Sequence, residues 1–105
     1  MMKRKDDLDL PREAIIDFCN RWEVKEFSIF GSILRDDFGP QSDVDVLLSF
    51  SKDSKWGLFE LVDMKEELES IFGREVDIVE KEGMKNPFRM NAILQNRKVI
   101  YAAAA

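Results

Sequence analysis

Residues 31–45 read GSILRDDFGPQSDVD, and this stretch decides how the rest of the chain is interpreted. A Gly-Ser pair follows one apolar run, and two carboxylates, Asp43 and Asp45, stand one residue apart at the start of the next. Glycine lets the backbone approach a phosphate closely, and paired carboxylates are ligands that a hard divalent cation prefers. The stretch therefore predicts a phosphate site and a metal site within one short segment.

The composition excludes several classes of protein. The chain has 105 residues, a net charge of −5 and no histidine, so a basic surface for duplex nucleic acid and a histidine-based zinc site are both unexpected. One cysteine, Cys19, permits no disulfide within the chain and is typical of a reducing compartment. The sequence shows no signal peptide and no apolar run that would span a membrane, so we expect a cytoplasmic protein.

Helical and strand patterns alternate along the chain. Helices are expected from Pro11 to about Trp22 and over residues 32–36, 58–72 and 87–95, and strands over residues 26–30, 43–50, 75–79 and 98–101. The order α-β-α-β-α-β-α-β predicts an α/β (α+β) fold. No internal repeat or domain boundary divides it, so residues 1–105 are expected to form a single domain, with residues 102–105 as a low-complexity tail.

The strand periodicity brings the carboxylates together. Residues two apart in a strand point to the same face, so Asp43 and Asp45 are expected to project together. Asp77 lies between Val76 and Ile78 in the next expected strand. If those two strands are neighbours, three carboxylates line one site, which with a polyphosphate would hold two metal ions for an in-line displacement.

The Gly-Ser turn supplies the other half of the expected site. Gly31 and Ser32 offer backbone N–H groups and a hydroxyl to phosphates, and Arg35 follows one helical turn later. Each part alone has a structural alternative. A Gly-Ser pair is commonly a simple turn, an Asp-x-Asp pair a solvated strand face, and Ser42 a brace for its loop. Because all of these parts occur together, each where one site would need it, the sequence favours a functional site.

The sequence resembles a known family at this point. Gly31-Ser32, ten residues and then Asp43-Val44-Asp45 match the signature of the DNA polymerase beta-like nucleotidyltransferases. The longer run from Phe30 to Leu47 is similar to the minimal nucleotidyltransferase (MNT) branch. Residues 75–79 resemble the strand that carries the third acid of the family, and the end of the chain, from Asn86 to Tyr101, is similar to the end of the branch.

The resemblance implies a fold and an activity. The fold would be a small mixed sheet of about four strands with helices packed mainly on one face. The activity would be transfer of AMP from ATP to an acceptor hydroxyl with Mg²⁺, two ions being expected, and release of pyrophosphate. Asp43, Asp45 and Asp77 would be the catalytic and metal-binding residues, and Gly31, Ser32, Arg35 and Ser42 would bind the nucleotide.

The branch also implies a partner. Small MNT proteins are commonly antitoxins that adenylylate a tyrosine of a HEPN-domain toxin, in a type VII-like toxin–antitoxin pair. This chain departs from the family at Leu34 and Asp36, where a small residue and glycine usually flank the arginine. That departure motivates a second hypothesis, a binding module that neutralises its partner without catalysis. A third, a small-molecule nucleotidyltransferase, is less favoured because such enzymes generally carry a further helical domain.

Overall fold

Two strands with buried side chains on both faces form the middle of the sheet. The computed structural model describes residues 10–34, 39 and 42–103, and its strands are ordered β3-β2-β1-β4. The strands are β1 (Val24–Phe30), β2 (Val44–Phe50), β3 (Val76–Glu80) and β4 (Lys98–Ala102). β1 runs antiparallel to β2 and to β4, and β2 runs parallel to β3. The expected mixed sheet is confirmed.

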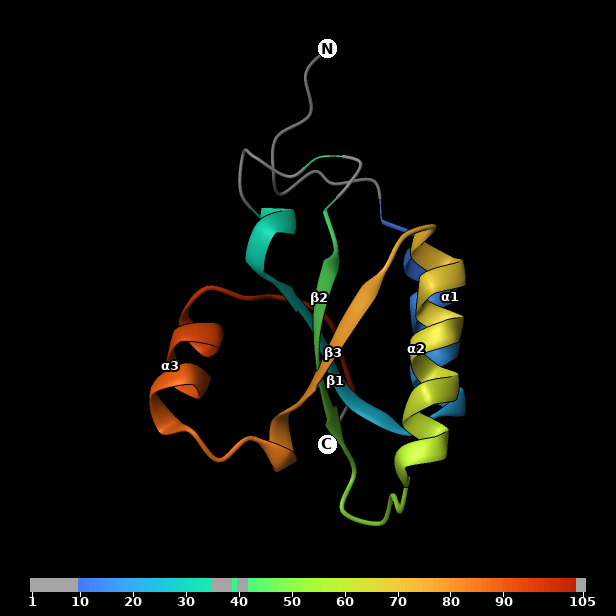
Figure 1. Ribbon diagram of the computed structural model, residues 1–105. Coiled ribbons are helices and arrows are strands. Elements are labelled where there is room, and N and C mark those ends of the chain that lie inside the picture. Colours follow the sequence, from blue (N-terminus) through green and yellow to red (C-terminus); the bar gives the residue numbers. More distant parts are fainter. Residues whose placement is uncertain (1–9, 35–38, 40–41, 104–105) are drawn as a thin grey trace.

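The helices cover both faces of this sheet. They are α1 (Arg12–Arg21), α2 (Leu58–Phe72) and α3 (Pro87–Gln95), with single 3-10 turns at η2 (Gly31–Leu34) and η3 (Lys81–Gly83). α1 and α2 lie together on one face and α3 lies on the other (Figure 1). The two longer helices thus share a face, as expected. None of the described helices is long and apolar enough to span a bilayer.

Of the element boundaries that differ from the sequence-based expectation, three bear on the core or the site. β1 begins at Val24 because that side chain is buried in the core and its residue pairs with Phe50 of β2. β2 begins at Val44, so Asp43 precedes the strand. The short helix expected over 32–36 is, in its described part, a 3-10 turn that starts at Gly31. Gly31 has a φ of 77°, which turns the chain sharply out of β1.

The main core lies between the sheet and the α1–α2 layer. It joins buried side chains of both helices to one face of the three strands beside them: Ile15, Phe18, Cys19, Met64, Leu68, Phe27, Ile29, Val44, Val46, Leu48 and Val76. Residues 44, 46 and 48 alternate along β2, so their side chains share the α1–α2 face. Asp45, Leu47 and Ser49 therefore face the α3 side of the sheet.

Polar contacts fix α1 against α2 at the edge of this core. The Trp22 indole N–H and the Arg21 guanidinium both donate to the Glu67 carboxylate, and the Trp56 indole N–H donates to the Trp22 carbonyl at 2.7 Å. The Arg21 hydrogen bond is the main cause that lowers the pKa of Glu67. Any stability from this contact is therefore present at neutral pH and is lost as acid protonates Glu67.

Cys19 belongs to the core. Its side chain is almost fully buried in α1, and burial raises the pKa of the thiol to about 12. A thiol with such a pKa is protonated at neutral pH and is a poor nucleophile. Cys19 therefore has a packing role.

The core predicts a large difference between two leucines of α2. We expect Leu68→Ala, at a fully buried position, to lower the free energy of unfolding by about 2–5 kcal/mol, because it leaves a cavity. Leu58→Ala, at a position 75% exposed, should change it by less than about 0.5 kcal/mol. Urea unfolding followed by tryptophan fluorescence measures both, and equal losses would contradict this description of the core.

Candidate active site

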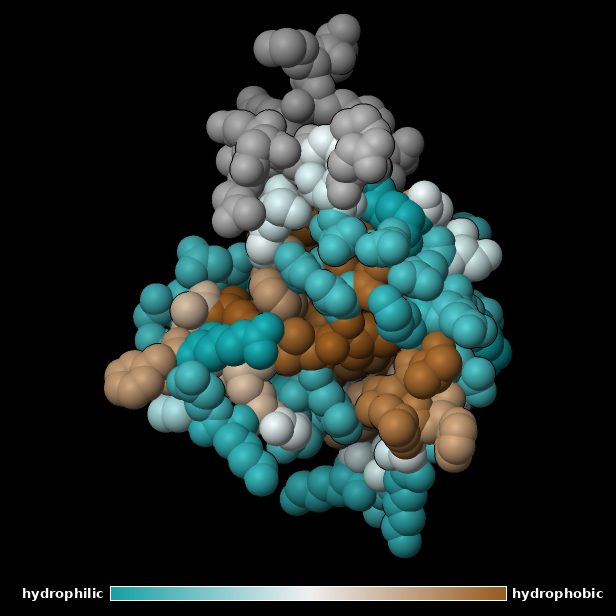
Figure 2. Space-filling model, viewed as in Figure 1, coloured by the Kyte–Doolittle hydropathy of each residue, from teal (hydrophilic) through white to brown (hydrophobic). Residues whose placement is uncertain are grey.

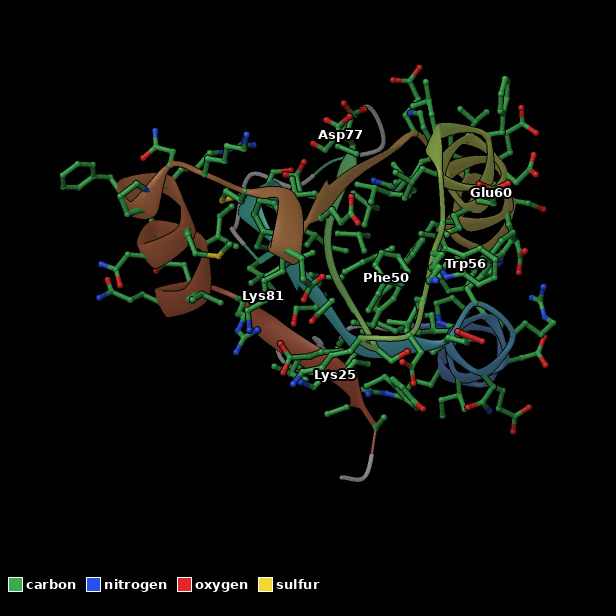
Figure 3. The ribbon with its side chains drawn as sticks, turned by 90° about the horizontal axis from the view of Figure 1, so that it is seen from below. Lys25, Phe50, Trp56, Glu60, Asp77 and Lys81 are labelled. Carbon is green, nitrogen blue, oxygen red and sulfur yellow. The ribbon has the colours of Figure 1, made fainter. Side chains whose placement is uncertain are left out.

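The parallel pairing of β2 and β3 places two acids side by side. Asp45 of β2 is in register with Asp77 of β3, and side chains at paired positions of parallel strands project to the same face. The pairing begins directly before them, where the Val44 N–H donates to the Glu75 carbonyl at 2.9 Å. The neighbouring strands that the sequence argument required are thus present. Figure 3 shows Asp77 between the α2 side and the α3 side of the molecule.

Asp43 stands at the same end of the sheet. It directly precedes β2, and its side chain is exposed, as is that of Asp77, whereas Asp45 is half-buried. Among the residues that the structure describes, no three His, Cys, Asp or Glu side chains have the arrangement of a preformed metal site. The three acids offer only carboxylate oxygens, a donor set that fits Mg²⁺.

Gly31 packs directly against one of these acids. A Cβ added at Gly31 would lie 2.2 Å from Oδ2 of Asp45, well inside van der Waals contact. Phe30, the residue before it, pairs with Asp45 across the β1–β2 ladder. Both the positive φ and the close approach therefore require glycine here. The expected phosphate-binding turn and the expected metal-binding carboxylate are in contact.

Ser32 joins the same arrangement. Its hydroxyl lies 3.4 Å from the Asp43 carbonyl oxygen, to which it donates a long hydrogen bond. The Gly-Ser turn thus contacts both residues of the Asp-x-Asp pair, one through the backbone of Gly31 and one through this hydroxyl. The turn and the acids, which ten intervening residues separate in the sequence, form one surface.

The structure gives Ser42 a bracing contact and leaves two other residues of the signature undescribed. The Ser42 hydroxyl accepts a hydrogen bond from the Gly39 N–H at 3.1 Å, and the Ser42 N–H donates to the Gly39 carbonyl at 3.0 Å. Nucleotide binding by Ser42 stays a prediction. Arg35 and Asp36 lie outside the described residues. Leu34 is partly buried: it packs against the core and also lines a cavity beside Gly31.

Arg74 supports the Asp43 end of the site, and the sequence analysis missed it. Its guanidinium donates to the carbonyl oxygens of Gly39, at 2.9 Å, and Ser42, at 3.1 Å. It therefore attaches the segment before Asp43 to the start of β3. The only local signal is a basic residue following Gly73, where α2 ends, and that signal does not identify its partners.

Two residues of α2 hold the start of β3. Lys65 donates to the Val76 carbonyl at 2.8 Å, and the Val76 N–H donates to the Glu69 carboxylate at 3.2 Å. The Val76 N–H is the main cause that lowers the pKa of Glu69, and the Lys65 ammonium adds to it. Because Val76 directly precedes Asp77, these contacts fix the third acid. Lys65 and Glu69 were also missed, since their spacing alone predicts only a helical ion pair.

The family relationship agrees with this geometry. The model of the nucleotidyltransferase domain family matches residues 12–100, and the chain belongs to that family. It is therefore a nucleotidyltransferase, in a mixed α/β fold of the kind described above. Within the family it falls in the minimal nucleotidyltransferase branch, which includes the MntA proteins.

Several relatives with similar sequences support this family assignment. A Thermococcus cleftensis protein named protein adenylyltransferase MntA is 32% identical over 81 residues, which cover 77% of this chain and 77% of the relative. A Methanocaldococcus jannaschii protein described as a candidate protein adenylyltransferase is 38% identical over 68 residues, 65% of this chain and 71% of that protein. These matches span most of both chains.

Solved structures share the fold. A structure described as a candidate minimal nucleotidyltransferase superposes with a TM-score of 0.69 at 30% identity, over 83% of this chain and 86% of the other. A chain in a toxin–antitoxin complex with AMP-PNP superposes with a TM-score of 0.74 at 16% identity, over 90% of this chain and 75% of the other. The second likeness concerns the fold alone.

The contact between Gly31 and Asp45 leads to a test with a matched control. Gly31→Ala and Gly73→Ala both place a side chain at positive φ, but a Cβ at Gly73 meets nothing within 4 Å. We expect Gly73→Ala to cost about 1–2 kcal/mol for the left-handed conformation, and Gly31→Ala to cost about 1–3 kcal/mol more because Asp45 must move. Urea unfolding measures both. Equal costs would show that the contact with Asp45 is unimportant.

Proposed function

We propose that this chain is a Mg²⁺-dependent protein adenylyltransferase that transfers AMP from ATP to a tyrosine of a HEPN-domain toxin, and so acts as the antitoxin of the pair. The observation that carries the proposal is the register of Asp45 with Asp77 while Gly31 packs against the Asp45 carboxylate. This arrangement joins a phosphate-binding turn to a set of acids that suits a metal-dependent phosphoryl-type transfer.

The residues divide the work of the reaction. Asp43, Asp45 and Asp77 would hold two Mg²⁺ ions, which when bound offset the charge of the phosphates and of the acids. Gly31 and Ser32 would bind the β- and γ-phosphates. The acceptor oxygen bonds to the α-phosphorus, the bond from that phosphorus to the oxygen bridging the β-phosphate breaks, and pyrophosphate leaves with the electron pair. With no histidine in the chain, the Asp77 carboxylate would orient the acceptor hydroxyl and take its proton.

The relatives support a protein acceptor. One relative is named protein adenylyltransferase MntA. A solved complex described as a tri-AMPylated Shewanella oneidensis HEPN toxin with its MNT antitoxin contains a chain of this fold, with a TM-score of 0.65. The proposal extends the modified residue type and the HEPN partner to this chain.

The surface beside Asp77 suits a partner protein. Leu58 and Phe59, at the start of α2, are 75% and 82% exposed, and apolar surface is visible over this end of the helix in Figure 2. A groove of about 340 Å³ next to them is lined by Leu58, Leu61 and Val62 and also by Asp77 and Ile78. Because the groove reaches Asp77, a protein that covers these side chains brings its own residues to the third acid. We therefore assign the groove to the acceptor protein.

Substitution of the acids tests the activity. With [α-³²P]ATP, Mg²⁺ and the product of the adjacent gene as acceptor, we expect label transfer to fall by roughly a hundredfold or more in the Asp43→Asn/Asp45→Asn variant. Asp63→Asn, an exposed acid of α2, is the control for lost negative charge and should transfer label normally.

The same variant separates the enzyme from a binding module. If it binds the partner but no longer neutralises it, catalysis is needed for neutralisation. If neutralisation is retained, or if the wild-type protein transfers no label to a competent partner, the proposed activity is wrong.

A pair of phenylalanines tests the partner surface. Phe59, which follows the groove-lining Leu58 in α2, and Phe88 on α3 are similarly exposed, at 82% and 85%. We expect Phe59→Ser to weaken binding of the partner by about tenfold or more, the scale of a well-packed aromatic contact, and Phe88→Ser to leave it nearly unchanged. Titration calorimetry with the partner measures both affinities. A larger loss for Phe88→Ser would move the interface to α3.

A further inference from the structure

A second cavity adjoins the Gly31 turn on the α3 side of the sheet. It measures about 410 Å³ and lies between the end of β1 with η2 and the helix α3. Phe30, Leu34 and Ile93 give it apolar walls, and Gly31 lies at its boundary. Figure 2 shows apolar surface between α3 and the sheet. The same glycine therefore contacts the Asp45 carboxylate and borders an apolar pocket.

Polar groups of α3 line the pocket. Asn96 donates its side-chain N–H to the Ala92 carbonyl at 2.9 Å, and its amide oxygen makes no hydrogen bond with the residues that the structure describes. Arg89 is exposed; its backbone N–H donates to Asn86, but its guanidinium forms no hydrogen bond or ion pair within that same set of residues. The guanidinium carries a charge opposite in sign to the net charge of −5 of the chain. It is suited to attract a polyanion to this face.

Arg89 also connects the pocket to the acids. It lines a smaller groove together with Ile78, Val79 and Glu80, so its side chain stands between the α3 pocket and β3. β3 carries Asp77 a few residues earlier on the same strand. A molecule that extends from the pocket across Gly31 toward Asp45 would therefore pass this guanidinium.

We infer that the pocket under α3 binds the nucleoside part of the nucleotide. A nucleoside is a mainly apolar ring system with a few polar atoms, and the lining offers apolar walls with two polar side chains, in a volume of the range typical for small ligands. The base and ribose lie between Leu34 and Ala92, and the phosphates cross Gly31 toward Asp45. Arg89 contacts the phosphate side, and the Asn96 amide oxygen accepts from the base. This assignment rests on the proposed function and adds its nucleotide-specificity site.

The position of the pocket favours a nucleoside over the acceptor. The acceptor must reach the acids from a place that the nucleotide leaves open, and Asp77 lines the separate groove beside α2. The α3 pocket borders the Gly-Ser turn instead. The nucleoside and the acceptor thus have separate openings beside the acids, so that neither blocks the other.

Filling the pocket tests the assignment. Titration calorimetry with Mg²⁺ compares AMP-PNP, which carries the nucleoside, with tripolyphosphate, which lacks it. We expect wild type to bind AMP-PNP about tenfold or more tighter than tripolyphosphate. Ala92→Phe should remove this preference while tripolyphosphate affinity is kept, which also shows that the variant is folded. Asn91→Phe, the neighbouring exposed position outside the pocket, should keep the preference.

Arg89 gives an independent test. Arg89→Met should weaken AMP-PNP binding by about fivefold or more, the scale expected for a charge-assisted hydrogen bond. Lys85→Met also removes one positive charge, but Lys85 precedes α3 and does not line the pocket, so this variant should have little effect. Equal losses of AMP-PNP affinity in the two variants would show that only the overall charge matters, and would overturn the role of Arg89 in the pocket.

The outcomes separate this inference from the proposed transfer reaction. If wild type transfers AMP but Ala92→Phe binds AMP-PNP as wild type does, the pocket assignment is wrong and the activity stands. If Ala92→Phe loses the preference for AMP-PNP while wild type transfers no AMP to its partner, the pocket assignment stands and the activity is wrong. Wild type that binds AMP-PNP no better than tripolyphosphate overturns the pocket assignment.

Discussion

The contact between Gly31 and the carboxylate of Asp45 is the constraint on which the site depends. At 2.2 Å from that oxygen, the position of a Cβ excludes every side chain, and the φ of 77° independently favours glycine. β1 therefore ends where β2 brings its acid closest. The turn that leaves β1 is fixed beside the carboxylates, and no loop movement is needed to bring them together.

Further contacts fix the segments on either side of that contact, and they come from elements outside the motif. Arg74 attaches the segment before Asp43 to the start of β3, and Lys65 with Glu69 holds Val76 at that same start. The long buried face of α2 keeps these polar groups in place, since Met64 and Leu68 anchor it in the core. The geometry of the acids is therefore a property of the α2–sheet packing as much as of the signature.

The two faces of the sheet have different tasks. The α1–α2 face holds most of the buried apolar side chains, whereas the α3 face presents Asp45 and the pocket next to Gly31. α3 is short and covers that face only in part, which leaves a cavity beside the turn. The edge strand β3 and the exposed apolar start of α2 lie at the other end of the site. The two sites that we propose, one for the nucleotide and one for a protein partner, thus lie on different parts of this sheet and its helices.

The sequence by itself determined the strand–turn–strand core of the site. The Gly-Ser pair, the Asp-x-Asp pair and the apolar runs around them are local patterns, so the strands, the helix over 58–72 and the turn at Gly31 follow from periodicity and from the chemistry of glycine. The register of Asp45 with Asp77, the 3-10 form of η2, the braces from Arg74 and Lys65 and the pocket under α3 were decided only by the tertiary structure. Each of these depends on which segments pack together. Contacts between residues far apart in the chain produce no regular spacing in a single sequence, so the sequence alone does not predict them.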